Sequence, residues 1–401
     1  MKITNLSLAA IAAMAFTTGV MADVDMKIGG QAVIYYQTND AGDADMFDDG
    51  ASSANFGLQL NANADLGNDF GLGLQGTALN TAGLEGNLVD GVRQSGLGNN
   101  GDTTTADNYF AVTKAYLTKK VANTTLKLGR QELPKSLSPF AFSENWNVFK
   151  NTFDAIVAVN TDIPDTTLVG AYVSKANSSS GNIGTFNYIN SATDSAGQHK
   201  GVYMLTAQNK SLAGLTPTLS YYQLTSLAKA YWVDVQADMT KLADVPVTVA
   251  LQGGQTKVNS GDAKKAAGIK VSGKAGPANV SLAYTKTGSQ GAVAIHNVGT
   301  GVKTPLYTQM VANQNDIKSG AEATVLKVVA PVGPGKVIAQ YGMMKDNVND
   351  DSDVQELDLI YKFKALGTNV FAGLISSKAD DNVYNGDDTR NIIRLWTRYN
   401  F

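Results

Sequence analysis

The sequence predicts an all-β protein, a single antiparallel transmembrane β-barrel of about 18 strands, and three observations lead to this prediction. Segments of about ten residues alternate apolar and polar side chains, as strands with one lipid-facing and one wet face do. Short turns and longer polar connections alternate along the chain. The last strand has an apolar face that ends at an aromatic residue, Phe401.

The composition is compatible with one large barrel. Of the 401 residues, 43% are hydrophobic and the mean hydropathy is only −0.11, because lipid-facing residues alternate with polar ones. The chain has no cysteine, which excludes disulfides, thiolate metal sites and thiol nucleophiles. Its formal net charge of −3 gives no indication of nucleic-acid binding.

The N-terminus predicts export. Lys2 is followed by an apolar segment at 6–16 and by the small-residue site Val20-Met21-Ala22, so 1–22 is expected to be a signal peptide and 23–401 the barrel domain. The apolar segment is too short to span a bilayer as a helix.

Taken in order, the elements follow one repeating unit. Residues 55–66 alternate without a fault, 67–69 form a turn, and 70–80 return. Further short turns, of the periplasmic kind, are expected at 121–123, 163–165, 212–214, 243–245, 276–277, 332–335 and 366–368. The long external connections are expected at 39–52, 81–106, 134–151, 177–198, 258–264, 288–318, 345–352 and 379–389, with one short connection at 226–228. Sixteen strands would result if the weak hairpin at 215–229 were misassigned.

Alternation also assigns the two faces of each strand. Apolar faces are expected to meet lipid at Tyr231, Val233, Val235, Ala237, Met239, Leu357, Leu359, Tyr361 and Phe363. The alternate positions hold carboxylates, among them Asp234, Asp238 and Asp358, which would be costly in lipid and are therefore expected to face a wet interior.

The terminal strand, 390–401, is expected to close the barrel against a first strand that begins at Val24. Its apolar face carries Leu395 and Tyr399, and its other face carries Arg394 and Arg398. With the basic residues Lys127, Lys270 and Lys274 of matching parity, these arginines form a pore lining that handles anions, or they satisfy other charges across the interior. The alternation along a strand shows which face a side chain lies on, but neither its height in the pore nor the group that it contacts.

The stretch Leu126-Lys127-Leu128-Gly129-Arg130-Gln131-Glu132, followed by Pro134 and by Thr152-Phe153-Asp154, resembles the Opr and major outer membrane protein families of porins. The resemblance implies a barrel of 18 or 16 strands, a third external loop folded into the pore, and Phe401 as part of the membrane-insertion signal. Outer membrane lipid and lipopolysaccharide, the barrel assembly machinery and a homotrimer are the implied partners. Arg130 shares parity with Leu126 and Leu128, so a bulge at Gly129 or a position above the hydrocarbon would be needed to turn it inward.

The connection at 134–151 differs from the others because it is rich in apolar residues, namely Leu137, Phe140, Phe142, Trp146, Val148 and Phe149. We expect it to fold against the inner wall, where burial stabilises each side chain by roughly 1.5–3 kcal/mol. Lys135, Glu144 and Lys150 would then line the constriction opposite Lys127, Arg130, Arg394 or Arg398. The alternative is an external loop that buries its aromatic rings among neighbouring loops.

No catalytic, cofactor-binding or metal site is expected. Residues 71–76 match G-x-G-x-x-G, but they lie within a strand and no helix follows. Residues 347–358 match part of a calcium-loop pattern, but Ser352 stands where that loop needs glycine. The two histidines, His199 and His296, fall in loops.

The expected function is passive diffusion of ions and small hydrophilic solutes through a water-filled channel. The alternatives are a substrate-selective channel and, from another class, a surface adhesin or structural barrel. Acidic external loops would raise the local cation concentration at the mouth, but charges at the narrowest point could overrule them.

Overall fold

The computed structural model describes residues 25–42, 45–95, 109–145, 147–177, 182–190, 192–290, 295–313, 319–348, 352–384 and 389–401. The expected signal peptide at 1–22 lies outside the described residues, as do Val24 and Trp146.

The described chain forms one sheet of nineteen antiparallel strands. The strands are β1 (Met26–Asn39), β2 (Ser52–Gly67), β3 (Phe70–Asn80), β4 (Tyr109–Val121), β5 (Thr124–Gln131), β6 (Phe153–Asn160), β7 (Thr166–Ala176), β8 (Asn187–Tyr188), β9 (Val202–Asn209), β10 (Leu215–Leu224), β11 (Ala228–Asp238), β12 (Val247–Val258), β13 (Ala263–Ala275), β14 (Ala278–Thr287), β15 (Ala321–Val332), β16 (Gly335–Asp346), β17 (Val354–Ala365), β18 (Thr368–Ala379) and β19 (Thr389–Asn400). The helical pieces are η1 (Asp49–Ala51), α2 (Met239–Ala243) and α3 (Asp381–Tyr384). In the part of the chain that the structure describes, no helix is long and apolar enough to cross a membrane.

The sheet closes on itself. Apart from the two-residue β8, which adds to β7, each strand pairs with the next, and β1 pairs with β19 from Gln31 opposite Asn400 to Asn39 opposite Ile392. The barrel therefore has eighteen strands, as predicted, and closure removes its sheet edges. The 215–229 hairpin is formed in full by β10 and β11, so the sixteen-strand alternative is wrong.

Tight turns join the strands at one end of the barrel. Asn68 and Asp69 link β2 to β3 with φ of 51° and 61°, the backbone of a two-residue hairpin. The turn between β11 and β12 is longer because it contains α2. Met239, expected at the end of a lipid face, instead begins this helix.

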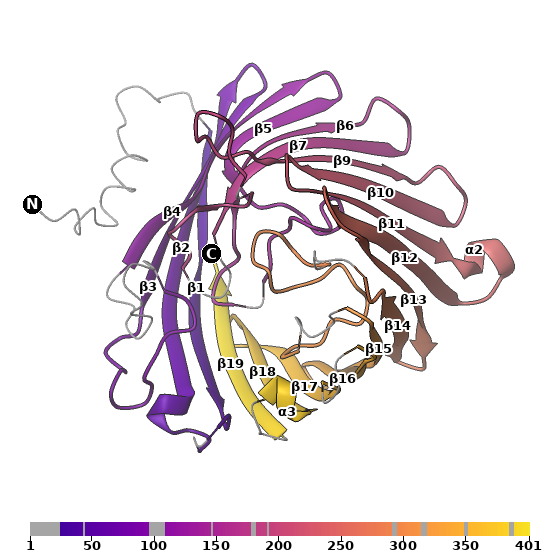
Figure 1. Cartoon of the computed structure of the whole chain (residues 1–401). Helices are drawn as coiled ribbons and strands as arrows, with labels where there is room; N and C mark the ends of the chain where they lie inside the picture. Colours follow the sequence, from indigo (N-terminus) through magenta and orange to yellow (C-terminus); the bar gives the residue numbers. More distant parts are fainter. Residues whose placement is uncertain are drawn as a thin grey trace, which may run out of the picture.

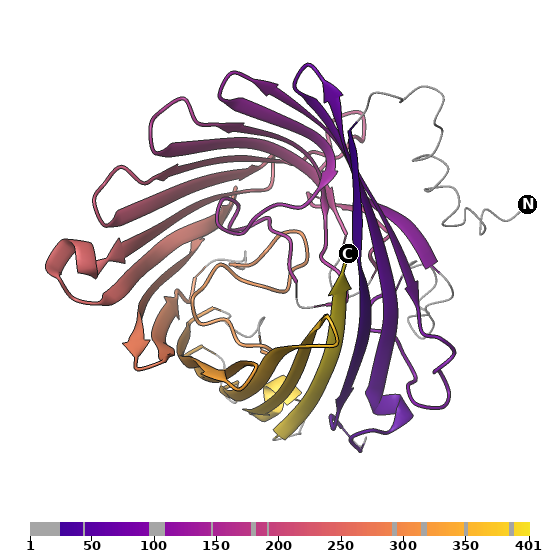
Figure 2. The same cartoon turned by 180° about the vertical axis from the view of Figure 1, so that it is seen from behind.

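The wall has the predicted two faces. Tyr231, Leu357, Leu359 and Leu395 are exposed on the outside, where lipid would cover them. Inside, Gln59 donates hydrogen bonds to Gln75 and Thr77 across β2 and β3, so these polar side chains satisfy one another. Figure 1 looks into the ring of strands, which follow one another in sequence order from β1 to β19, and Figure 2 shows the same ring from behind.

Candidate functional site

Two long connections lie inside the ring of strands in both views (Figures 1 and 2). They are loop 3 (132–152), between β5 and β6, and loop 7 (288–320), between β14 and β15. Loop 3 contacts the wall through apolar side chains: the Phe140 ring packs edge-to-face on Tyr222 of β10 and Trp232 of β11, at centroid distances of 5.3 and 5.5 Å. Phe140 and Phe149 are almost completely buried.

Glycines on the wall allow both loops to approach closely. A Cβ atom at Gly57 of β2 would lie 2.5 Å from the Phe149 ring of loop 3. At Gly342 of β16 it would lie 2.6 Å from the sulfur of Met310 in loop 7. Any larger residue at either position would collide with the loop that packs there.

A buried polar joint connects the two loops. Asn297 of loop 7 donates from Nδ2 to the Phe142 carbonyl and to the Glu144 carboxylate, each at 2.8 Å, and accepts from the Phe142 backbone N–H at 3.2 Å. Glu144 also accepts from the hydroxyl of Thr300 and from the backbone N–H of Lys303. Only 3% of Glu144 is exposed. Glu144, expected to line the constriction, is thus buried where the two loops meet.

Loop 7 is held on the opposite wall by a second carboxylate. Glu356 of β17 accepts backbone hydrogen bonds from Ala312 at 3.0 Å and Asn313 at 2.9 Å, and also from Val311. The Asn313 side chain donates to Ser377 of β18 at 2.6 Å. Loop 7 is therefore attached both to loop 3 and to the wall.

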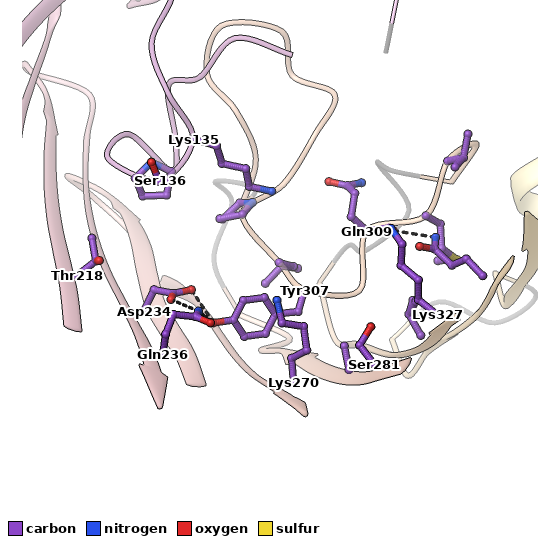
Figure 3. Close-up of a pocket in the computed structure, with 18 of the residues that line it drawn as sticks. Lys135, Ser136, Thr218, Asp234, Gln236, Lys270, Ser281, Tyr307, Gln309 and Lys327 are labelled. Carbon is purple, nitrogen blue, oxygen red and sulfur yellow. Dashed lines mark hydrogen bonds between the residues drawn. The ribbon is translucent and has the colours of Figure 1, made fainter. Parts of the chain in front are cut away.

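A cavity of about 630 Å³ remains between the loops and the wall from β9 to β17 (Figure 3). Tyr307 of loop 7 reaches into it and donates a hydrogen bond of 2.6 Å to Asp234, which also accepts from Gln236 at 2.6 Å. Lys270 lies over the Tyr307 ring at 4.5 Å from its centroid. The charged residues of the lining are Lys135, Asp234, Lys270, Lys327, Asp358 and Lys362. Lysines outnumber carboxylates in this lining.

Burial lowers the pKa of two lysines, one on each loop. Lys135 donates to the Thr304 carbonyl at 2.8 Å, and burial lowers its pKa to about 8 in spite of the opposing charge of Glu144. Burial also lowers the pKa of Lys303 to about 7; Glu144 opposes this shift, and Lys135, Arg394 and Lys362 add to it. The positive charge of the two loops therefore changes near neutral pH.

A smaller hollow of about 360 Å³ lies beside β1 and β19. Arg398 lines it and donates to the Asn147 carbonyl of loop 3 at 2.7 Å and to Gln31 at 3.2 Å. Lys150 lines it as well and forms an ion pair of 2.9 Å with Glu132, so it does not stand free. Lys362 lines both this hollow and the larger cavity.

Arg394 and Lys127 face the interior but line neither space. Arg394 is almost fully buried and donates to Gln37 of β1 at 2.9 Å. The Lys127 ammonium lies 3.8 Å from the centroid of the Tyr116 ring. Each of these two cations thus contacts a neutral side chain of a neighbouring strand.

Arg130 lies on the outer face of the wall, apart from the lumen. Arg130 pairs with Asp154 at 2.8 Å and stacks on the Phe186 ring. It points to the same side of β5 as the exposed Leu128, whereas the buried Gln131 points to the other side. Gly129 has a φ of 120°, but the pairing of β5 with its neighbours shows no register shift, so no bulge turns Arg130 inward.

Asp238 also lies away from the cavity. Its carboxylate accepts a hydrogen bond of 3.1 Å from the Thr240 N–H and so caps α2 at the short-turn end of the barrel. Of the 347–358 pattern, Asp358 faces the cavity, and 349–351 lie outside the described residues.

Sequence reasoning missed the part that loop 7 plays. Lys303 and Tyr307 lie in a loop with no strand periodicity, so nothing local indicated where they point. Glu356 and Lys362 have the same parity as Asp358, but the backbone N–H groups that bind Glu356 lie more than 40 residues away in the sequence. Lys327 could have been found by the same parity on β15.

Comparisons with known proteins agree with this architecture. A family model described as Gram-negative porin matches residues 8–382. The fold is similar to that of OccAB2 of Acinetobacter baumannii, at 14% identity and a TM-score of 0.76, over 94% of this chain and 98% of that chain. It is also similar to OpdK of Pseudomonas aeruginosa in a structure with vanillate, at 14% identity and a TM-score of 0.74, and to OccK8 (OprE) of the same organism, at 13% and 0.73; each match covers 94% of this chain and 98% of the other. A sequence comparison with curated proteins finds no match.

Proposed function

Because the chain belongs to the Gram-negative porin family and is a channel of the outer membrane, we propose that it passes ions and small hydrophilic solutes by diffusion through a pore narrowed by loops 3 and 7. The family and fold indicate a channel rather than an enzyme. The observation that carries the proposal is the joint at Glu144 and Asn297, because it ties the two loops together inside the ring of strands.

The constriction follows from the size of the barrel. An eighteen-stranded barrel is too wide for the side chains of its own wall to fill, so solute sieving needs something folded inside. Loop 3 lies against β10 and β11, and loop 7 lies against β16 and β17. The cavity between them is the proposed passage.

The charges of this passage favour small anions over cations. Four lysines line it together with two aspartates, the lysines being Lys135, Lys270, Lys327 and Lys362. One of the aspartates, Asp234, accepts two hydrogen bonds from neutral groups. The acidic external loops would raise the cation concentration only at the mouth. We therefore propose that the constriction, rather than the mouth, sets the ion preference.

A substrate-selective channel is the second candidate, and the basic cavity supports it. The structurally similar OpdK was crystallised with vanillate, a carboxylate. A carboxylate solute would find ammonium donors in the cavity from loop 3 and from the β13, β15 and β17 wall.

Planar-bilayer recordings of the purified protein test the channel. Stepwise conductance is expected, and its absence from correctly folded protein would contradict a pore. The reversal potential under a salt gradient then reports ion preference, with an anion-selective sign expected. Saturable block by a carboxylate such as vanillate, with no block by a neutral molecule of the same size, would favour the selective channel.

The partners of the channel are also proposals. A homotrimer and recognition by the barrel assembly machinery come from the family resemblance. Phe401 fits the second of these because its exposed ring lies at the end of β19 beside Tyr399, with ring centroids 5.9 Å apart.

A further inference from the structure

Tyr307 of loop 7 lies between two opposite charges of the cavity (Figure 3). Its hydroxyl donates a hydrogen bond of 2.6 Å to Asp234, and the Lys270 ammonium lies over the face of the same ring, 4.5 Å from its centroid. Among the described residues, Lys270 and Asp234 form no ion pair, either with each other or with another side chain. The cavity therefore holds a lysine and an aspartate that both touch one ring and do not meet.

The wall alone would not keep these two charges apart. Lys270 of β13 is opposite Ala250 of β12, and Ala250 is opposite Gln236 of β11. Neighbouring strands are about 4.8 Å apart, so Lys270 lies two strand spacings from Gln236, and Asp234 is the next inward residue on β11. The small side chain of Ala250 leaves this path open to a long lysine side chain. The Tyr307 ring is the group that occupies it.

The Asp234 carboxylate is occupied on both oxygens. Tyr307 donates to Oδ2, and Gln236 donates to Oδ1 at 2.6 Å and to the Tyr307 hydroxyl at 3.1 Å. Burial, together with the hydrogen bond to Asp234 and its negative charge, raises the pKa of Tyr307 above its usual value, so the hydroxyl stays protonated and remains a donor. Asp234 thus has neutral donors in place of a cation.

We propose that Tyr307 is a specificity-determining residue of the channel, an insulating ring that prevents Lys270 from pairing with Asp234 and so leaves Lys270 available to passing anions. This inference rests on the proposed function, since it concerns ions that cross the cavity. Without the ring, the two side chains would form an ion pair. A paired ammonium attracts a passing anion less, because the charge of its partner opposes its own at nearly the same distance.

A double-mutant cycle in planar bilayers tests the insulating ring, with the ratio of chloride to potassium permeability under a KCl gradient as the readout. Tyr307→Ala should lower this ratio by about 5-fold, the effect of one unit charge a few ångström from an ion in watery surroundings. In the Asp234→Asn background Lys270 has no carboxylate to pair with, so Tyr307→Ala should leave the ratio unchanged. The Lys270→Met background should abolish the effect of Tyr307→Ala as well.

The matched control is Tyr231→Ala, because Tyr231 lies on the same strand as Asp234 but is exposed on the outer face. With every variant confirmed as folded by heat-dependent migration, this control should keep the parent's ratio. An unchanged ratio in Tyr307→Ala would overturn the proposal. An equal loss in the parent and Asp234→Asn backgrounds would also overturn it, by assigning Tyr307 to loop packing alone. A parent without conductance would overturn the proposed function and this inference with it, whereas the other two outcomes overturn the inference alone.

Discussion

The Glu144 carboxylate of loop 3 lies where little water reaches it, and the donors that stabilise it come from loop 7. Asn297, Thr300 and the Lys303 N–H donate to it. Hydrogen bonds to an ionised group are among the stronger ones in proteins, and a buried donor left without its acceptor costs about 1–3 kcal/mol. The joint is therefore sensitive to substitution of Glu144.

We expect Glu144→Ala to loosen the contact between loops 3 and 7 without unfolding the barrel, because the strand pairing does not involve this residue. Single-channel recordings should show higher conductance and more open-channel noise than the parent. Glu322→Ala, which removes a carboxylate paired with Lys286 on the outer face, is the control and should conduct like the parent. Parent-like conductance and noise in Glu144→Ala would show that the joint does not shape the pore.

Lys303 and Lys135 give the channel a pH dependence of defined sign. Their pKa values of about 7 and about 8 lie below the usual 10.5, so both lose positive charge as the pH rises through these values. Anion preference, measured as reversal potential, should be strongest near pH 6 and should fall by about pH 9. The double variant Lys135→Met/Lys303→Met should lack most of this change. A parent channel with constant selectivity over this range would contradict the assignment.

The same lowered pKa values make the free energy of unfolding increase as the pH rises. In the unfolded chain both lysines stay protonated up to about pH 10.5, so above pH 7 the unfolded state binds more protons than the native state. The cost of burying these charges is present at low pH and is relieved as the pH rises.

At the scale of elements, loops 3 and 7 act together, with loop 3 packed on β10 and β11 and loop 7 on β17. Deleting Ser138–Asn147 removes Phe140, Phe142 and Glu144, and with them the wall contact and the joint. Conductance should rise and larger neutral solutes should pass. Deleting an equal length from the 40–51 connection between β1 and β2 is the control. Unchanged conductance in a folded loop 3 deletion would place the constriction elsewhere.

The elements themselves could be predicted from the sequence because strand periodicity is local. Parity placed Tyr231, Leu359 and Leu395 outside and Asp234 inside, and the structure agrees. Loop contacts could not be predicted in this way. Glu144 and Asn297 are separated by more than 150 residues, and no repeating pattern relates them. For Arg130, the alternation along the strand already indicated the outer face, and the structure places it there.

At the scale of the whole molecule, the barrel depends on the seam between β1 and β19. Gly30 and Phe401 exchange backbone hydrogen bonds of 2.8 and 3.1 Å at the end of this seam. A Cβ at Gly30 would lie 2.7 Å from the Phe401 ring and 2.3 Å from the Gln59 carbonyl oxygen of β2. Only glycine permits this approach of three strands.

We therefore expect Gly30→Val to weaken closure by roughly 1–3 kcal/mol, the usual cost of overpacking. The folded, fast-migrating form on unheated gels should be lost at a lower temperature than in the parent. Gly170→Val is the matched control, because that glycine also faces outward but its new Cβ would meet only Leu205, at 3.7 Å. If both variants lose the folded form at the parent's temperature, the seam tolerates a side chain at Gly30 and closure does not depend on this contact. If both lose it equally early, the effect belongs to valine in a strand rather than to the seam.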